Sequence, residues 1–314
     1  MKKVITVTLN PCIDKTFNLE KFSKGNVNRA DDWRIDAGGK GINVSRALTN
    51  FKVSNIALGI IGGNTGERLK RLLLEEGIES DFLEVLGDTR TNYKIFDKES
   101  KDTTDINEAG IPMDNMIMER FLEKYREHLK NAEYVVLAGS LPPNTDKAVY
   151  RVLIEEAEKM GVRAILDAEG EALKEGIAAM PYAIKPNIHE FEELLGRKMK
   201  NESEILEGMK EINKSGIELV VVSMGGDGAI FMKDNVAFKT KPLLMDKKST
   251  VGCGDAVVSG IVYSLVNGFD LKKTAMVASA AGSVTASLDG TNMCKKDEVM
   301  SVYSNVITER VEFL

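Results

Sequence analysis

Short apolar runs alternate with longer amphipathic segments along most of the chain. Four of these runs are rich in Val, Ile, Leu or Ala: Tyr134–Ala138, Ala164–Leu166, Ala183–Ile184 and Leu219–Val222. Such runs are typical of strands buried on both faces of a parallel sheet. Residues 116–130, 148–160 and 202–215 place apolar side chains at three- and four-residue spacing, which predicts helices. The pattern therefore predicts an α/β fold with a doubly wound, mainly parallel sheet flanked by helices.

One region departs from this alternation. Residues 88–108 contain two runs of alternating polarity, Thr91–Phe96 and Thr103–Asn107, separated by a polar turn, which predicts a hairpin. With residues 12–36 it is predicted to form a small antiparallel sheet, interpreted either as a lid over an active site or as an ordinary edge hairpin. Since no repeat or linker marks a boundary, we expect one domain over residues 1–314, with a discontinuous lid from roughly 12–36 and 88–108.

Composition narrows the possible partners. The chain has 314 residues and a net charge of -6, which argues against a nucleic acid or an anionic membrane as partner. Its three cysteines form no Cys-x-x-Cys pair, which fits a reducing cytoplasm better than a disulfide framework or a zinc site. The N-terminal run is too short for a signal peptide, and no uncharged stretch reaches transmembrane length. We therefore expect a cytoplasmic protein.

The strongest candidate for chemistry is the segment Ser249–Asp255, which reads STVGCGD and leads into an apolar helical stretch. Gly252 and Gly254 bracket one small residue, so backbone N–H groups can converge at the start of a helix and hold a developing anion. This arrangement suits phosphoryl transfer. Asp255 falls in the first turn, where a carboxylate can cap the helix or take a proton from a substrate hydroxyl. The flanking glycines favour the catalytic role.

A second glycine-rich segment, Ala37–Leu48, reads AGGKGINVSRAL and also opens a helix. Glycine permits close backbone approach, Lys40 supplies a positive charge, and Asn43 can both donate and accept hydrogen bonds. Taken alone, the segment would read as a glycine-rich turn with a solvated lysine. The chain contains neither a Walker A loop nor a dinucleotide-binding Gly-x-Gly-x-x-Gly after a strand.

Together the two segments resemble the signatures of the PfkB (ribokinase-like) family of carbohydrate kinases, a GGKGxN-type and a GAGD-type segment. The resemblance covers essentially the whole chain. Further matches in the same order are Thr8–Asp14, Gly139–Pro143, Lys185–Glu190 and Val222–Ala229. The resemblance implies a ribokinase-like kinase domain that uses ATP and Mg²⁺.

The resemblance also implies the catalytic roles. Asp255 would deprotonate the acceptor hydroxyl, while Gly252, Cys253 and Gly254 would form the anion hole for the transferred phosphate. The family usually has alanine in place of Cys253. We expect this departure to be tolerated, because backbone N–H groups form the hole.

ATP and Mg²⁺ are assigned by resemblance to residues near strand ends, where open α/β sheets bind ligands. The ATP candidates are Lys185, Asn187, Ser223, Gly225, Gly228 and Gly254. Asn187 and Glu190 match the family's NxxE motif, which implies Mg²⁺ held through water, as suits a cation that keeps its hydration shell. Without the family resemblance, Glu190 would be interpreted as one of several acidic residues on a solvated helix face.

The residues that bind the sugar substrate are assigned by resemblance in the same way. The candidates are Asp14, Gly38, Gly39, Lys40, Asn43 and Ser140, together with Arg90 and Arg29. An arginine fork suits a phosphate dianion, whereas a kinase for a neutral sugar or nucleoside has no use for several cations. We therefore expect a substrate that already carries a phosphate.

Within the family, Thr8–Pro11, Gly139–Pro143 and the lid strand Thr89–Lys94 are most similar to kinases that phosphorylate fructose 1-phosphate at O6 to give fructose 1,6-bisphosphate. Kinases for tagatose 6-phosphate and fructose 6-phosphate share most of these features and stay as alternatives. A non-catalytic sugar-phosphate sensor is the alternative of another class, and the retention of Asp255 with its glycines argues against it. The resemblance also implies a homodimer formed through the lid.

Overall fold

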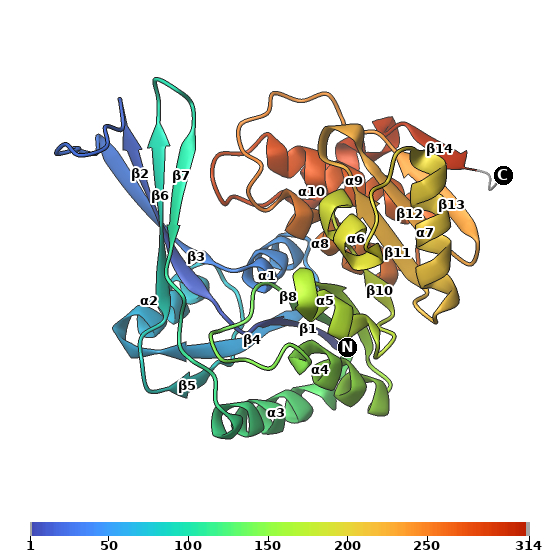
Figure 1. Ribbon diagram of the computed structural model, residues 1–314, viewed down its shortest axis with the longest axis horizontal. Helices are drawn as coiled ribbons and strands as arrows, with labels where there is room; N and C mark the ends of the chain where they lie inside the picture. Colours follow the sequence, from blue (N-terminus) through green and yellow to red (C-terminus); the bar gives the residue numbers. More distant parts are fainter. Residues whose placement is uncertain (1, 312–314) are drawn as a thin grey trace.

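The main body of the protein is a ten-stranded sheet, in the order β14-β13-β12-β11-β10-β9-β8-β1-β4-β5 (Figure 1). The computed structural model describes residues 2–311. The strands of this main sheet are β1 (Lys3–Thr8), β4 (Asn55–Gly62), β5 (Leu83–Val85), β8 (Ala132–Ala138), β9 (Arg163–Asp167), β10 (Ala183–Ile184), β11 (Leu219–Ser223), β12 (Ala229–Lys233), β13 (Val236–Thr240) and β14 (Thr308–Val311). From β11 to β5 every neighbouring pair is parallel, and β12, β13 and β14 add an antiparallel edge.

Helices cover both faces of this sheet. They are α1 (Lys40–Asn50), α2 (Gly63–Glu75), α3 (Asn115–Leu129), α4 (Val149–Lys159), α5 (Gly170–Ile177), α6 (Ile188–Leu195), α7 (Glu202–Lys214), α8 (Cys253–Val266), α9 (Leu271–Ala286) and α10 (Lys296–Val302), with short 3₁₀ turns at Gly225–Asp227 and Tyr303–Asn305. Successive side chains of a strand point to opposite faces, so Ile5 packs in the cluster formed with α3 to α7, whereas Val4 packs with α1, α8 and α9. The predicted doubly wound α/β fold is confirmed.

Close helix packing explains one of the glycines on this second face. A Cβ at Gly260 of α8 would lie only 2.6 Å from the Cα of Ala278 on α9, so the two backbones meet where neither helix carries a large side chain. Residues Asp255–Ser264 of α8 are all buried. α8 is therefore packed on all sides, and this packing fixes the position of its first turn.

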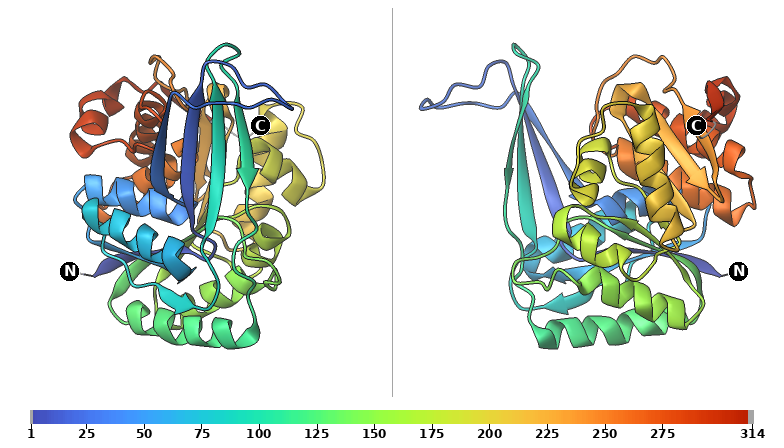
Figure 2. Two further views of the ribbon diagram at one scale, coloured as in Figure 1. Left: turned by 90° about the vertical axis from the view of Figure 1, so that its left-hand side faces the viewer. Right: turned by 45° about the vertical axis from the view of Figure 1, so that its right-hand side comes forward.

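A second, four-stranded sheet stands clear of the main body, with its strands side by side in Figure 2. We call it the small sheet. It consists of β2 (Cys12–Leu19), β3 (Asp32–Gly38), β6 (Arg90–Asp97) and β7 (Thr103–Asn107), in the order β3-β2-β6-β7. The outer pairs are antiparallel, and the central pair of β2 with β6 is parallel. The small sheet predicted from two separate segments is thus present, joined by a parallel pair that the sequence pattern did not indicate.

Within residues 2–311, no helix is both long enough and apolar enough to cross a membrane.

Candidate active site

The predicted site residues gather at one edge of the main sheet. Parallel strands end at a common edge, and open α/β sheets bind ligands there. Ser140 follows β8, Asp167 ends β9, Lys185 follows β10 and Ser223 ends β11. The start of β2, with Asp14, follows β1 at the same edge. Residues far apart in the sequence are therefore brought together by strand order alone.

Asp255 is buried in the first turn of α8. The N-cap of this helix is Gly252, in the left-handed conformation with φ 76°, and Asp255 is the third helical residue. The carboxylate accepts a hydrogen bond from Asn43 Nδ2 at 2.8 Å, across the gap between α8 and α1. Of the two roles predicted for Asp255, the structure therefore does not use the capping one, and the carboxylate faces the GGKG segment.

Burial raises the pKa of Asp255 to about 6, and the negative charge of Asp167 adds to the rise. The hydrogen bond from Asn43 and the charges of Lys40 and Lys185 oppose it. A carboxylate with this pKa is ionised at neutral pH and still accepts a proton readily, as a general base requires.

Two lysines converge on one buried carboxylate beside this base. Lys40 Nζ and Lys185 Nζ each lie 3.4 Å from Oδ1 of Asp167, whose side chain is only 1% exposed. Burial disfavours the charge of Lys40, but nearby carboxylates, first that of Asp167, raise its pKa above the usual range. A Cβ at Gly254 would lie 3.4 Å from Lys185 Nζ. The first turn of α8 therefore has a positive charge directly beside it, as an anion site requires.

Asp167 was not among the predicted site residues. It follows the apolar run Ala164–Leu166 at the carboxyl end of a buried strand, and that placement was the available signal.

The glycines of the GGKG segment allow α1 to start against β1. Gly39 has φ 128°, and a Cβ there would lie 2.6 Å from Thr8 Cγ2. A Cβ at Gly41 would lie 2.5 Å from Thr8 Oγ1, and one at Gly38 would lie 2.9 Å from Asp14 Oδ2. Any side chain at these positions would displace α1, and with it Lys40 and Asn43.

On the small sheet, Asp14 is buried and already paired. It accepts hydrogen bonds from Asn92 Nδ2 at 3.2 Å and from Lys94 Nζ at 3.0 Å. Both partners come from β6, which lies parallel to β2. Their contact with Asp14 depends on the register of that parallel pair, which the sequence pattern does not specify, so the contact was not predicted.

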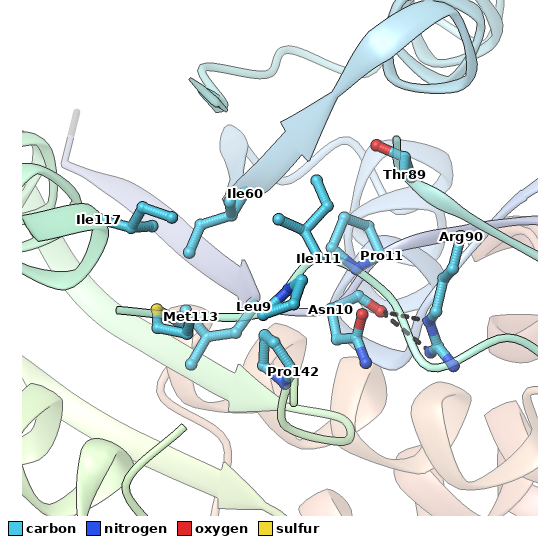
Figure 3. Close-up of a pocket in the computed structure, with 11 residues that line it drawn as sticks. Leu9, Asn10, Pro11, Ile60, Thr89, Arg90, Ile111, Met113, Ile117 and Pro142 are labelled. Carbon is cyan, nitrogen blue, oxygen red and sulfur yellow. Dashed lines mark hydrogen bonds between the residues drawn. The ribbon is translucent and has the colours of Figure 1, made fainter. Parts of the chain in front are cut away.

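Arg90 is fixed by the backbone of the chain. Its Nε and Nη2 donate to the carbonyl oxygen of Asn10 at 3.1 and 3.0 Å, as Figure 3 shows, and Nη2 also lies 3.5 Å from Ser140 Oγ. A Cβ at Gly139 would lie 3.8 Å from Lys40 Cβ, so Arg90, Ser140 and Lys40 follow one another along the site. Arg29 lies elsewhere, in the exposed loop between β2 and β3 at the far end of the small sheet.

A cavity of about 340 Å³ adjoins the start of α8, and this volume is typical of a small-molecule site. Ser223, Gly225 and Gly228 line it together with Cys253 and Gly254, so part of the predicted nucleotide set and part of the predicted anion hole share one cavity, whereas Lys185, Asn187 and Gly252 are not in its lining. Burial, and after it the charge of Asp255, raises the pKa of Cys253 to about 11, so this side chain is an ordinary thiol at neutral pH.

Asn187 and Glu190 form the capping box of α6. Asn187 Oδ1 accepts from the N–H groups of His189 and Glu190, and the Glu190 carboxylate accepts from the Asn187 N–H at 2.7 Å. Glu190 is thus a structural residue and not merely one acid on a solvated face. In residues 2–311, no three His, Cys, Asp or Glu side chains gather as a metal site. The predicted role of Asn187 and Glu190 in holding Mg²⁺ through water stays a prediction.

The fold and this site are those of a kinase of the ribokinase-like class. The chain belongs to the pfkB family of carbohydrate kinases, whose sequence model matches residues 7–298. A 1-phosphofructokinase of Bacillus subtilis is 36% identical over 283 residues, which are 90% of this chain and 92% of that protein. A 1-phosphofructokinase of Borreliella burgdorferi is 33% identical and covers 98% of this chain and 99% of its own.

Solved structures agree with this assignment. The crystal structure of phosphofructokinase-2 from Escherichia coli in complex with fructose-6-phosphate has a TM-score of 0.90 at 28% identity, covering 97% of this chain and 99% of that one. The structure of a possible 1-phosphofructokinase from Thermotoga maritima has a TM-score of 0.89 at 27% identity, covering 99% of this chain and 100% of that one.

Asp255→Asn should raise the free energy of unfolding at pH 7.5. Folding raises the pKa of this carboxyl from its usual 3.8 to about 6, so the folded state loses stability as the pH rises through that range. The amide removes a cost of about 3 kcal/mol that is fully present above the folded pKa and absent below the unfolded one. Urea unfolding at pH 7.5 and at pH 3.5 measures the difference. Asp234→Asn, in an exposed turn, is the control, and a less stable Asp255→Asn protein at pH 7.5 would contradict the expectation.

Proposed function

We propose that the protein transfers the γ-phosphoryl group of ATP to O6 of fructose 1-phosphate, giving fructose 1,6-bisphosphate and ADP. The observation that carries this proposal is the buried carboxylate of Asp255, with a pKa raised to about 6, in the first turn of α8 and beside the cavity at Gly254. The choice of fructose 1-phosphate is supported by relatives named 1-phosphofructokinase at 33% and 36% identity.

In the proposed reaction, Asp255 takes the proton of the O6 hydroxyl as O6 bonds to the γ-phosphorus. The bond from that phosphorus to the β,γ-bridging oxygen breaks, and its electron pair leaves with ADP. By resemblance, the backbone N–H groups of Gly252, Cys253 and Gly254 would face the charge that develops on the transferred group, although that of Cys253 donates to the Thr250 carbonyl at 3.4 Å in this structure. Lys185 and Lys40 supply positive charge at the same place. Alignment and charge neutralisation are the main demands of phosphoryl transfer.

Mg²⁺, when bound with ATP, neutralises charge on the phosphate groups. Glu190 would hold it through water, because one of its carboxylate oxygens already accepts the Asn187 N–H. The small sheet would act as the lid that excludes water from the transfer, with Asp14 toward the sugar hydroxyls. In the same proposal ATP occupies the cavity lined by Ser223, Gly225 and Gly228.

Fructose 6-phosphate is the second candidate substrate. The structural similarity to Escherichia coli phosphofructokinase-2, solved with fructose-6-phosphate, favours it. Tagatose 6-phosphate is the third, and a sensor without activity is the alternative of another class.

A coupled ADP-release assay separates these candidates. Purified protein with MgATP is tested against fructose 1-phosphate, fructose 6-phosphate, tagatose 6-phosphate, fructose and ribose. We expect the highest kcat/KM with fructose 1-phosphate, and a loss of activity of about 100-fold or more in Asp255→Asn, the range for a general base. In the wild type kcat/KM should fall as the pH drops through 6, because Asp255 becomes protonated.

Other outcomes of this assay have defined meanings. A higher kcat/KM with a neutral sugar would refute a phosphosugar substrate, and turnover with none of the five compounds would favour the sensor. Activity retained by Asp255→Asn would remove Asp255 as the base.

Arg90→Met should raise the KM for the phosphosugar by about 10- to 100-fold and leave the KM for MgATP unchanged. The lost charge-assisted hydrogen bonds to a phosphate are of that size. Arg90→Lys keeps the charge without the planar fork, so its KM for the phosphosugar should lie between those of the wild type and Arg90→Met. Arg90 also binds the Asn10 carbonyl, so kinetics with fructose serve as the control for a structural effect. An equal loss of kcat/KM with fructose and with the phosphosugar would mean that Arg90 only supports the fold.

We also propose that the chain forms a homodimer through the small sheet. β3 and β7 are the edges of that sheet, and they carry two exposed apolar side chains, Trp33 at 59% and Ile106 at 55% exposure. Sedimentation velocity should show a dimer for the wild type and a monomer for Trp33→Ser with Ile106→Ser. Leu86→Ser, which replaces a side chain that is 97% exposed outside the small sheet, is the matched control. A dimer that survives the double substitution would place the interface elsewhere.

A further inference from the structure

Arg46 lies one turn after Asn43 on α1, and its guanidinium group joins three elements. Nη1 donates to Asn43 Oδ1 at 2.8 Å, and Nη2 donates to the Ala37 carbonyl at the end of β3 at 2.9 Å. Nε pairs with Glu76, the C-cap residue of α2. The Arg46 side chain is 12% exposed and that of Glu76 is 32% exposed, so the contacts with Asn43 and Ala37 are better shielded from water than the ion pair with Glu76. The fork geometry of arginine permits all three at once.

The contact with Asn43 matters because an amide has two different ends. One end accepts hydrogen bonds and the other donates them, and the surrounding contacts decide which way it faces. Here the oxygen faces the Arg46 cation, and the NH₂ group faces the Asp255 carboxylate at 2.8 Å. Turning the amide by 180° would set its oxygen against a carboxylate and its NH₂ group against a guanidinium. Both contacts would then be repulsive.

We propose that Arg46 is a positioning residue for the base, because its guanidinium group fixes the Asn43 amide with the NH₂ group toward Asp255. The inference rests on the proposed function, in which Asp255 takes the proton. It assigns to Arg46 no contact with substrate. The anchor on Glu76 and the bond to Ala37 hold the guanidinium in place, so the orientation of one amide depends on three neighbouring elements.

The donor from Asn43 is one of several influences on Asp255. The charged groups that face this carboxylate are Asp167 from β9, Lys40 from α1 and Lys185 after β10. Burial and Asp167 favour protonation, whereas Asn43 and the two lysines favour the charged form. Without Arg46 the amide is free to turn, and the carboxylate loses a donor. The pKa of Asp255 then rises, and its orientation is no longer fixed.

Three variants test the proposal. Arg46→Met removes the guanidinium, and Arg46→Lys keeps a charge that cannot reach all three partners. Arg126→Met is the matched control, because Arg126 Nε also binds a glutamate, Glu156, at 2.6 Å, between α3 and α4. The pH dependence of kcat/KM is measured for each, with thermal unfolding to show that each is folded.

In Arg46→Met we expect kcat to fall about tenfold, with the acidic limb of kcat/KM moved to higher pH by about one unit, the value of one lost hydrogen bond to a charged group. Arg46→Lys should lie between this protein and the wild type, and Arg126→Met should match the wild type in both respects. If Arg46→Met is folded and the acidic limb of its kcat/KM profile lies at the same pH as in the wild type, the proposal is overturned. Arg46 would then be a purely structural link between α1 and α2.

A second measurement needs no turnover. The side-chain NH₂ resonances of Asn43, assigned by their absence in Asn43→Asp, are followed by NMR against pH. In the wild type they should titrate with a midpoint near 6, and this titration should vanish in Asp255→Asn. In Arg46→Met or Arg46→Lys the midpoint should rise or the titration disappear; an unchanged titration would refute the proposal. If the titration behaves as expected but the wild type shows no kinase activity, the proposed function fails and the positioning by Arg46 stands.

Discussion

Two carboxylates are buried side by side where the main sheet ends, and their repulsion has to be balanced before any other part of the site can exist. An unpaired buried charge is among the costliest features a fold can carry. Here Lys40 and Lys185 each lie 3.4 Å from the same oxygen of Asp167, and Asn43 donates to Asp255. The pKa of Asp255 is therefore set by burial, which raises it most, together with four groups: Asp167 raises it further, and Asn43, Lys40 and Lys185 oppose the rise.

The balance depends on close packing of backbones as much as on charge. Lys40 and Asn43 are one turn apart on α1, and α1 can start where it does only because Gly39 and Gly41 leave room for Thr8 of β1. On the opposite side, α8 is held close to α9 at Gly260. The two helices that carry the base and its donor thus take their places from positions without side chains. A methyl group at one of these glycines would change the distances on which the electrostatics depend.

The sequence predicted the parts of this arrangement that depend on local pattern. Buried strands such as Leu219–Ser223 follow from apolar runs, and the first turn of α8 follows from the glycines around Cys253. Contacts that depend on register between distant segments could not be predicted in this way. The pairing of Lys94 with Asp14 requires the parallel alignment of β2 with β6. Asp167 belongs to neither glycine-rich segment, and its importance appears only when two lysines from different elements meet it.

The capping box of α6 shows a different limit. The spacing of Asn187 and Glu190 is the same for a helix cap and for a metal-binding motif, so the pattern cannot separate the two roles. The structure adds that both oxygens engaged in the cap accept backbone N–H groups.

The attachment of the small sheet determines how it can move. β2 starts at Cys12 and β3 ends at Gly38, directly opposite each other, and β6 starts at Arg90 on the same rung, with the end of β7 two residues away. All four strands therefore join the body along a single line, which would act as a hinge with one axis if the small sheet is the lid of the proposed function. Asp14 and Arg90 lie next to that axis and would travel little when the sheet rocks, whereas Leu19 and Phe96 at the far end would travel furthest. Such a lever would separate two tasks: the proposed ligand contacts would stay nearly formed at its base, while the swing of its tip would govern access to solvent.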